Sequence, residues 1–352
     1  MKLALFLALA ATQWQTLPVP TQASFRGLST VDDNIVWASG TEGTVLRTTD
    51  GGKTWTKLKV PKAEDLDFRG IHAFDDKAAV LMSSGPAEKG QARVYRTTDG
   101  GKTWTQVLEE KTKGAFFDAI AFWDAKHGIL LGDPVEGHFM IYTTQDAGET
   151  WQRVVPLKMP SALAGEGAFA ASNSCLAVGG NGTAWFGTGG GPVARVFRST
   201  NGGLSWTVFD TPIHPANAST GIFSLVFQSA LNGLFVGGDY QQPAANFPNP
   251  FVANDGGRAW APIHSISHAG ESQSPFLSSV VLAPGANHGP NVFVAAGPSG
   301  IYSLGSDHQW VRQSDVSANV LAFPSATTGW AVGPKGMIAR WNIEPAAGVQ
   351  KP

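Results

Sequence analysis

Residues 48–55 read Thr-Thr-Asp-Gly-Gly-Lys-Thr-Trp, and the same eight residues return without a change at positions 97–104. Weaker copies follow, and they end at Trp151, Trp206, Trp260 and Trp310. From the first copy to the last, successive tryptophans are 49, 47, 55, 54 and 50 residues apart. Repeats of about 40–50 residues are typical of β-propeller blades. The octet therefore predicts one repeated structural unit along most of the chain.

Each unit contains an alternating apolar run, a turn, a second run that ends in glycine, a third run, the octet and a tryptophan strand. In the first unit the predicted strands are Phe25–Val31, Ile35–Ser39, Thr44–Arg47 and Thr54–Val60. Short alternating runs separated by Gly, Asp and Asn indicate antiparallel strands joined by tight turns. We therefore predict an all-β fold built from four-stranded antiparallel blades.

The last unit, residues 319–341, has three predicted strands and no tryptophan strand. Residues 14–19, Trp-Gln-Thr-Leu-Pro-Val, resemble the tryptophan strands of the other units. If they pair with the last unit, they close a ring and cover strand edges that would otherwise promote aggregation. We predict a single domain, a seven-bladed β-propeller over residues 12–344, followed by a C-terminal tail at 345–352.

The first residues predict an export signal. Lys2 precedes nine uncharged residues, 3–11, in which Ala8-Leu9-Ala10 has the small-x-small pattern of a signal peptidase site. Nine apolar residues are too few for a membrane-spanning helix, which needs about 20. We expect residues 1–11 to be a signal peptide and the protein to be periplasmic or secreted, without stable membrane insertion.

Composition narrows the classes of partner and cofactor. The 352 residues include 25 Lys and Arg against 27 Asp and Glu, and only 15% are charged, so a nucleic-acid-binding surface is not expected. Cys175 is the only cysteine, which excludes an intrachain disulfide and cysteine-based zinc or iron–sulfur sites. We expect a monomer without a cofactor.

The Ser/Thr-x-Asp-x-Gly-x-Thr-Trp octets resemble Asp-boxes (BNR-like repeats), which are shared by sialidases, some endoglucanases, sortilin-type receptors and the photosystem II stability and assembly factor family. The motif has a local reason: the aspartate can accept backbone hydrogen bonds across a tight turn, the glycine supplies a positive φ, and the tryptophan packs between blades. One carboxylate per turn is too few for calcium, so no metal is predicted. The positions interpreted as structural are Asp50, Gly52, Trp55, Asp99, Gly101, Trp104, Asp146, Gly148, Trp151, Trp206, Asp255, Gly257 and Trp260.

In a propeller, the starts of the inner strands and the connections between second and third strands share one face around the central channel, where binding groups collect. Aligning the inner strands places one column on this face: Arg26, Arg69, Asp118, Gly167, Phe223, Ser278 and Asn319. In the fourth unit the second strand is predicted at 176–179, so that Trp185 falls in a glycine-rich connection, either presented for contact or packed between blades. The connections and flanking residues add the other candidates: Asp133, Glu136, His138, Glu166, Trp185, Asp239 and Tyr240.

Two functions fit this face. A carbohydrate-active hydrolase could use a pair of carboxylates from Asp118, Asp133, Glu136 and Glu166. The alternative is a salt-bridged channel, in which such carboxylates pair with Arg26 and Arg69. A sialidase-like mechanism would also need a free tyrosine, and only Tyr240 lies outside the repeated third-strand position.

The propellers that resemble the photosystem II stability and assembly factor are exported or lumenal scaffolds that hold a client protein, and their central face is arginine-rich. The resemblance implies that Arg26 and Arg69 occupy that face here, whereas Asp118 departs from the pattern. We therefore favour a non-enzymatic scaffold that binds a protein or peptide client. A sialidase- or glycosidase-like enzyme, with a glycan as its ligand, is the alternative.

Overall fold

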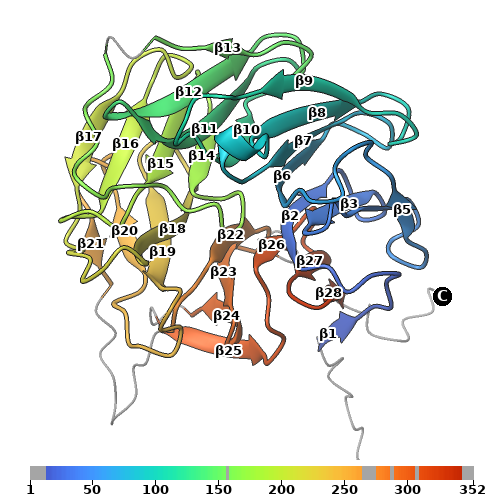
Figure 1. Ribbon diagram of the computed structural model, residues 1–352. Coiled ribbons are helices and arrows are strands. Elements are labelled where there is room, and N and C mark those ends of the chain that lie inside the picture. Colours follow the sequence, from blue (N-terminus) through green and yellow to red (C-terminus); the bar gives the residue numbers. More distant parts are fainter. Residues whose placement is uncertain (1–12, 156–157, 264–274, 286–288, 306–308, 343–352) are drawn as a thin grey trace, which may run out of the picture.

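The computed structural model is a ring of seven four-stranded antiparallel sheets, and each sheet forms one blade (Figure 1). The structure describes residues 13–155, 158–263, 275–285, 289–305 and 309–342. The predicted fold class and the predicted number of blades are confirmed. Among the residues that the structure describes, the one short helical turn is η1 (Ala87–Lys89) in blade two, and no helix there is long and apolar enough to cross a membrane.

The strands of each blade follow one another from the channel outward. Blades one to three contain β2 (Phe25–Thr30), β3 (Val36–Gly40), β4 (Val45–Thr48) and β5 (Thr56–Leu58); β6 (Phe68–Ala73), β7 (Ala79–Ser83), β8 (Arg93–Thr97) and β9 (Thr105–Glu109); and β10 (Phe117–Phe122), β11 (Gly128–Val135), β12 (His138–Thr144) and β13 (Gln152–Arg153). Blades four to six contain β14 (Leu176–Gly179), β15 (Thr183–Gly187), β16 (Arg195–Ser199) and β17 (Thr207–Asp210); β18 (Thr220–Phe227), β19 (Gly233–Asp239), β20 (Phe251–Ala253) and β21 (Ala261–Pro262); and β22 (Ser279–Ala283), β23 (Val292–Gly297), β24 (Gly300–Leu304) and β25 (Trp310–Ser314). Blade seven contains β26 (Val320–Ala322), β27 (Thr328–Val332), β28 (Ile338–Asn342) and β1 (Gln13–Thr16).

The N-terminal strand closes the ring, as predicted. β1 pairs antiparallel with β28, so that Trp14 lies opposite Trp341. Beyond β1, Leu17 donates its backbone N–H to the carbonyl of Ile338 at 2.8 Å and packs on the core between blades seven and one. The outer strand of blade seven therefore comes from one end of the chain and its three other strands from the opposite end. The predicted signal peptide and the predicted tail at 345–352 lie outside the described residues.

Blade four corrects the sequence analysis. The segment 176–179, predicted as the second strand, is the inner strand β14, and the second strand is β15, which contains Trp185. The segment around Gly167, predicted as the inner strand, instead forms a single bridge to Gly189 and then runs along the channel. The prediction failed because the run that ends in Gly179 and continues with Gly180-Asn181-Gly182 has the same pattern as the second strands of other units.

Each complete Asp-box is a turn whose threonine hydroxyl and aspartate carboxylate make their hydrogen bonds within the motif. In blade one, the buried Thr48 hydroxyl donates to Asp50 at 2.8 Å and accepts from the N–H of Gly52 at 2.9 Å. Asp50 also accepts from the N–H of Thr54 at 2.9 Å, and Gly52 has a φ of 84°. The Thr48 hydroxyl and the Asp50 carboxylate thus find their partners within the motif, so the same turn can be repeated in most blades.

The tryptophans that end the octets pack against the preceding blade. Trp104 of blade two meets Trp37 of blade one edge to face, with 6.3 Å between ring centroids. Trp55 of blade one meets Trp330 of blade seven in the same way at 5.9 Å. Edge-to-face packing is a favourable arrangement of aromatic rings. The seams between blades are thus apolar, and each seam joins segments that are distant in sequence.

Arginines that the sequence analysis did not single out tie these seams together. Arg47 donates to the carbonyl of Asp76 in blade two, and its guanidinium lies 5.3 Å from the ring centre of Trp37. Arg340 of blade seven donates to the carbonyl of Gly51 in blade one at 2.9 Å and covers the Trp330 ring in the same way. A guanidinium over an indole is a cation–π contact, so each arginine adds a polar bond and an aromatic contact to one seam.

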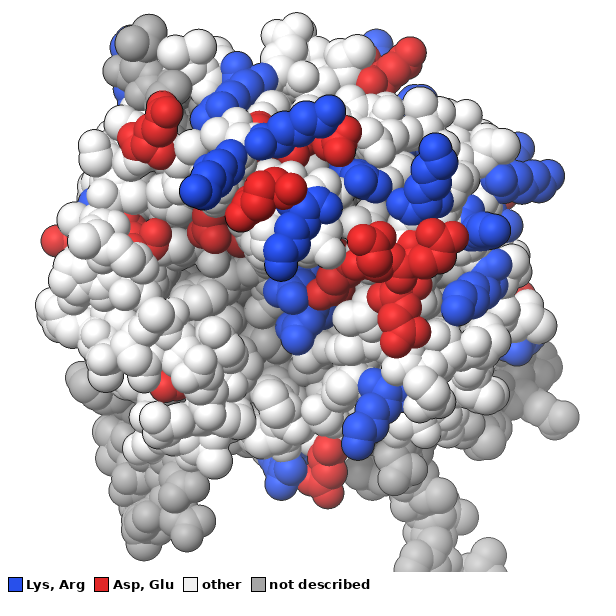
Figure 2. Space-filling model, viewed as in Figure 1, with Lys and Arg blue, Asp and Glu red and all other residues white. Residues whose placement is uncertain are grey.

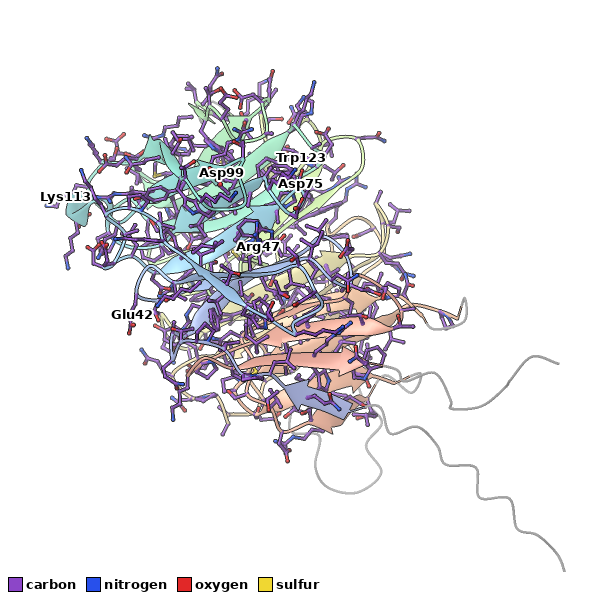
Figure 3. The ribbon with its side chains drawn as sticks, turned by 90° about the vertical axis from the view of Figure 1, so that its right-hand side faces the viewer. Glu42, Arg47, Asp75, Asp99, Lys113 and Trp123 are labelled. Atoms are coloured by element: carbon purple, nitrogen blue, oxygen red, sulfur yellow. The ribbon has the colours of Figure 1, made fainter. Side chains whose placement is uncertain are left out.

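The ring has two different faces. In the side view of Figure 3, Glu42 and Lys113 lie toward one face, whereas Asp75 and Trp123 lie toward the other. Figure 2 shows one face of the ring: charged side chains gather over the blades of the N-terminal half, and the surface is hollowed near its centre.

We expect removal of residues 1–19 to destabilise the whole ring. The deletion exposes the edge of β28 and removes the buried contacts of Leu17. A loss of strand pairing and of apolar side chains should lower the free energy of unfolding by roughly 3–5 kcal/mol. Urea denaturation followed by circular dichroism measures it, with a chain that begins at Gln13 as the control. An unchanged midpoint for the shorter chain would contradict the role assigned to β1.

Candidate functional site

The inner strands carry β-bulges at the predicted column. The pairing register shifts between Phe25 and Gly27 in blade one and between Phe68 and Gly70 in blade two. The shifts between Phe117 and Ala119 in blade three and between Ile222 and Ser224 in blade five are equivalent. The residues that leave the ladder are Arg26, Arg69, Asp118 and Phe223. A bulge re-aims a side chain, and here all four side chains line the same cavity.

This cavity has a volume of about 490 Å³ and lies where the inner strands begin. Five of the predicted binding residues line it, together with three further residues of the predicted column: Arg26, Arg69, Asp118, Asp133, Tyr240, Phe223, Ser278 and Asn319. The sequence analysis missed the remaining wall, formed by Phe116, Ala168, Phe169, Ala170, Ala171, Phe276 and Pro298. The candidate site is thus a mixed aromatic and charged cavity on the predicted face.

The segment 168–174 crosses the channel and forms one wall of the cavity. Phe169 stacks on Phe223 with 4.0 Å between ring centroids and 10° between ring planes. Further along the segment, the Ser172 hydroxyl donates to the carbonyl of Ser278 at 2.6 Å. Asn173 exchanges two hydrogen bonds with the backbone of Ile120. The segment therefore contacts blades three, five and six at once, and no local sequence pattern predicts such contacts.

The two arginines hold this segment. Arg69 donates to the carbonyl of Ala170 at 3.2 Å, and Arg26 donates to that of Ala171 at 3.4 Å. Arg69 also forms an ion pair with Asp67 at 2.7 Å. Burial, and next to it the positive charge of Arg69, lower the pKa of the Arg26 guanidinium. Two like charges that lie close together in a partly buried site favour a ligand that supplies negative charge or carbonyl oxygens.

The carboxyl groups of the cavity do not pair with these arginines, and Asp118 is buried whereas Asp133 is partly buried. Asp118 is 1% exposed, and neither of its carboxyl oxygens has a hydrogen-bond partner. Asp133 accepts one hydrogen bond, from the N–H of Ala168 at 3.0 Å. Within the described residues, no ion pair closer than 4 Å joins either carboxyl to Arg26 or Arg69. The salt-bridged channel considered in the sequence analysis is therefore absent from the described part.

Burial changes the protonation of both acids. Burial first, and then the charge of Asp133, raise the pKa of Asp118 well above its usual range. Burial raises the pKa of Asp133 to about 6, although the hydrogen bond from Ala168 opposes the shift. The folded chain therefore keeps protons that the unfolded chain loses above about pH 4. For Asp133, the free energy of unfolding therefore falls as the pH rises from about 4 to about 6.

Three predicted residues lie elsewhere on the surface. Glu136 and His138 belong to the tip of the β11–β12 hairpin, where Glu136 is exposed and has a φ of 53°. Asp239 accepts from the Ser219 hydroxyl at 2.6 Å and from the Asn217 amide at 3.0 Å, and it does not line the cavity. The structure therefore does not bring these side chains into the carboxylate pair considered for a hydrolase.

Glu166 and Trp185 are internal. Glu166 accepts from the Nε of Arg195 at 2.9 Å and from the Thr188 hydroxyl at 2.6 Å, and the Glu166–Arg195 ion pair is almost fully buried. Trp185 is 1% exposed, stacks on Phe227 and donates its Nε1 hydrogen to the carbonyl of Gly256. Of the two expectations for Trp185, presentation for contact is wrong and packing between blades is correct, because the residue belongs to a second strand.

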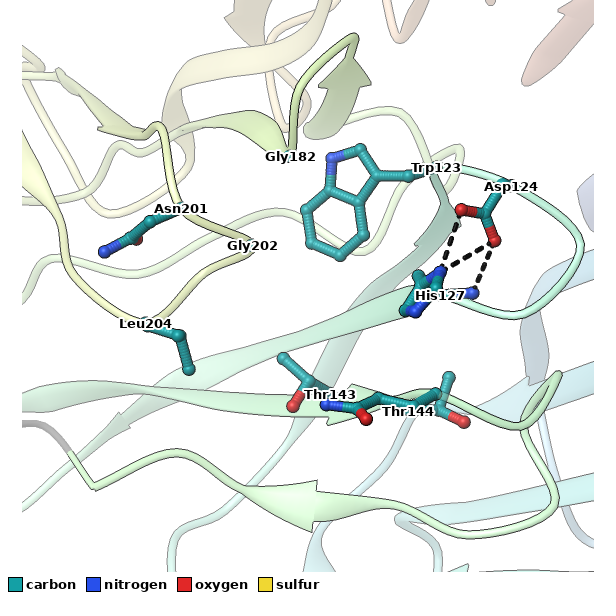
Figure 4. A pocket seen from close by; sticks show the side chains of 11 residues that line it. Trp123, Asp124, His127, Thr143, Thr144, Gly182, Asn201, Gly202 and Leu204 are labelled. Atoms are coloured by element: carbon teal, nitrogen blue, oxygen red, sulfur yellow. Dashed lines mark hydrogen bonds and ion pairs between the residues drawn. The ribbon is translucent and has the colours of Figure 1, made fainter.

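A second cavity of about 300 Å³ lies between blades three and four (Figure 4). Trp123 lines it and donates to the carbonyl of Thr183 at 2.7 Å, and His127 there pairs with Asp124 at 2.8 Å. None of the predicted binding residues lines it. Among the described residues, no group of three His, Cys, Asp or Glu side chains could hold a metal ion, in this cavity or elsewhere.

We expect Asp133→Asn to stabilise the protein at neutral pH. Asparagine keeps an oxygen that can accept from Ala168 but never has to be buried as an anion. The free energy of unfolding should rise by about 1–3 kcal/mol at pH 7, and the gain should vanish below about pH 4, where aspartate is protonated in both states. Urea titrations between pH 4 and 8 measure this. The control is Asp124→Asn: backbone hydrogen bonds from His127 and Lys126 lower the pKa of Asp124 to about 2, so this change should destabilise at pH 7. A stability difference for Asp133→Asn that does not vary with pH would contradict the assigned burial.

Comparison with known proteins adds independent findings. The model of the family "Photosynthesis system II assembly factor YCF48" matches residues 7–156. No curated protein matches the chain in sequence. The similar solved structures include YCF48 bound to D1 peptide, with 18% identity, a TM-score of 0.63, and coverage of 96% of this chain and 99% of that one.

Other similar structures show how widely this fold occurs. YCF48 from Cyanidioschyzon merolae is 19% identical with a TM-score of 0.62, and the match covers 94% of this chain and 99% of that one. An ancestral GH74 enzyme is 15% identical with a TM-score of 0.60, and the match covers 94% of this chain but 46% of the enzyme. At such identities the likeness shows the fold. In its repeats and its seven blades, this chain is an Asp-box propeller that resembles the photosystem II assembly factor YCF48 family.

Proposed function

We propose that the chain is an exported, non-enzymatic scaffold that binds a protein or peptide client at the central cavity. The observation that carries the proposal is the convergence of four bulged residues, Arg26, Arg69, Asp118 and Phe223, on one cavity of about 490 Å³. Pockets for small molecules and for peptide side chains are commonly of this size. β-Bulges are frequent beside such sites, where they re-aim a side chain.

The chemistry of the wall suits a polypeptide. Tyr240 is half exposed, and Phe223 packs edge to face on Phe276 beside it. Aromatic and arginine side chains are the groups that contribute most to protein interfaces. Arg26 has guanidinium hydrogens left to bind carbonyl or carboxylate oxygens of a client. The similar structure of YCF48 with a D1 peptide supports a peptide as the class of client.

A hydrolase is the second candidate, because the buried Asp118 and the partly buried Asp133 both have raised pKa values, as a catalytic acid requires. However, both carboxyl oxygens of Asp118 are out of contact with solvent, so they cannot reach a glycosidic oxygen without a rearrangement of the inner strands. Glycan cleavage by the purified protein, lost in Asp118→Asn, would replace the scaffold proposal.

Export is part of the proposal and rests on Lys2 and the apolar run 3–11, which lie outside the described residues. Cell fractionation should recover the protein from the periplasm or the medium. N-terminal sequencing should find a chain that begins downstream of Ala10. Recovery from the cytosol alone, with Met1 or Lys2 intact, would contradict export.

Photo-crosslinking tests the client site. A photoreactive phenylalanine derivative replaces Tyr240, which lines the cavity, or, as a matched control, Leu204, which is 61% exposed and lines the cavity between blades three and four. Illumination in the native host should join a polypeptide to position 240 and not to position 204. In the chain that carries the photoreactive residue at position 240, the additional change Arg26→Gln should lower the yield of the crosslinked product several-fold. No product at position 240, or the same product from both positions, would contradict the proposed site.

A further inference from the structure

The cavity between blades three and four has an aromatic and polar wall that the proposed function does not use. Its wall comes from the β10–β11 turn, from the end of β12 and from two turns of blade four. Every residue of this wall, with its neighbours in the chain, is among the described residues. The cavity shares no lining residue with the central cavity, so a ligand bound here leaves the client site free.

Trp123 supplies this cavity with a fixed aromatic surface. Its Nε1 donates to the carbonyl of Thr183 in blade four at 2.7 Å, so the half-buried indole bridges the two blades. In Figure 4 the flat side of the ring lies beside the space that Gly202, Leu204 and Thr143 border. Because the N–H group of the indole is already bonded, the ring offers a ligand its apolar face.

Glycines leave room beside this ring. Gly182 and Gly202 belong to two turns of blade four, and the N–H of Gly202 donates to the carbonyl of Gly182 at 2.8 Å. Both glycines have a positive φ, of 68° and 72°. A Cβ at Gly202 would meet no other atom within 4 Å. The wall is therefore open at this turn, and a ligand can approach the indole there.

The two ionisable side chains of the wall pair with each other. Asp124 accepts from the His127 ring at 2.8 Å, and from the backbone N–H groups of Lys126 and His127 at 2.7 and 2.8 Å. These bonds keep the carboxylate ionised and hold the ring in place. A negatively charged ligand would be repelled by Asp124, and a positively charged one would have to displace His127 from it. The wall therefore favours an uncharged ligand.

Neutral hydrogen-bonding groups remain free for such a ligand. Thr143 is half-buried and Gln145 is exposed, and neither side chain is hydrogen-bonded to another described residue. The bond from Nδ1 of His127 to Asp124 leaves Nε2 without a partner in the described part. A hydroxyl and a primary amide each donate and accept hydrogen bonds, as do the hydroxyl groups of a polyol. An apolar ligand would instead cover these groups and leave them unpaired, which is unfavourable.

We propose that the cavity between blades three and four binds a pyranose ring of a neutral saccharide. The C–H groups on one side of the sugar pack on the electron-rich face of Trp123. The sugar hydroxyls bond to Gln145, Thr143 and Nε2 of His127. The cavity volume of about 300 Å³ lies at the lower end of the range for ligand pockets, which suits a single ring. This site is independent of the proposed client site, and either can exist without the other.

Saturation-transfer NMR with methyl β-D-glucopyranoside, methyl β-D-galactopyranoside and methyl α-D-mannopyranoside tests the site. The wild-type protein should transfer saturation to at least one of these probes in a saturable manner. Trp123→Ala should abolish the transfer, and Gln145→Ala should weaken binding several-fold. The matched control is Gln228→Ala, because Gln228 is also exposed but lines neither cavity, and it should bind as the wild type does. Circular dichroism establishes that each variant is folded, and if Trp123→Ala is not, Gln145→Ala decides alone.

The results that would overturn the site are distinct. No saturable transfer to any of the three probes would do so, as would equal binding by the wild type and by Gln145→Ala. A capped Gly-Pro-Gly peptide, which also has a compact ring and hydrogen-bonding groups, tests the class of ligand. Saturable transfer to this peptide and to none of the glycosides would show that the cavity takes a polypeptide and would contradict a saccharide.

Discussion

The pairing of β1 with β28 is the interaction on which the rest of the structure depends. A propeller blade packs against two neighbours, and a ring with one open seam would expose apolar faces and strand edges on both sides of the gap. Because the closing strand comes from the N-terminus, the third and outer strands of blade seven have no direct connection. Every other blade joins these strands through an Asp-box or its remnant. Closure of the ring therefore also determines that the seam between blades six and seven lacks a turn.

Closure also brings the seven inner strands together around one axis, where their side chains are closely packed. Glycine follows the bulged arginine in blades one and two, and a Cβ at Gly70 would lie 2.9 Å from Ile120 of the next blade. The bulges turn Arg26, Arg69 and Asp118 out of the ladder, and all three residues line the central cavity. There the arginines bind carbonyls of the crossing segment, while burial raises the pKa of the Asp118 carboxyl. The face combines hydrogen-bond donors with aromatic rings, which suits a peptide better than it suits hydrolysis.

The sequence was sufficient for the architecture because the octets are local. The hydrogen bonds of an Asp-box span four residues, so the motif marks one turn in each blade, and the resemblance of 14–19 to tryptophan strands predicted the closure. The column of Arg26, Arg69 and Asp118 could also be predicted, by aligning the inner strands. The crossing segment 168–174 could not be predicted, because the carbonyls that Arg26 and Arg69 bind lie 145 and 101 residues away in the sequence. Trp185 was misplaced for a related reason: the inner strand of blade four is β14 and not the segment around Gly167, and the second strand follows the turn Gly180-Asn181-Gly182.

Hydrogen–deuterium exchange of the protein with and without its captured client tests the central claim, that the client binds where the bulged inner strands meet the crossing segment. Exchange reports local protection of backbone amides, so it separates the two faces of the ring. The account predicts slower exchange in residues 166–174 and at the strand starts 25–27 and 68–70, with no change in the Asp-box turns 48–55 and 97–104. Protection confined to the Asp-box turns, with residues 166–174 unaffected, would contradict it.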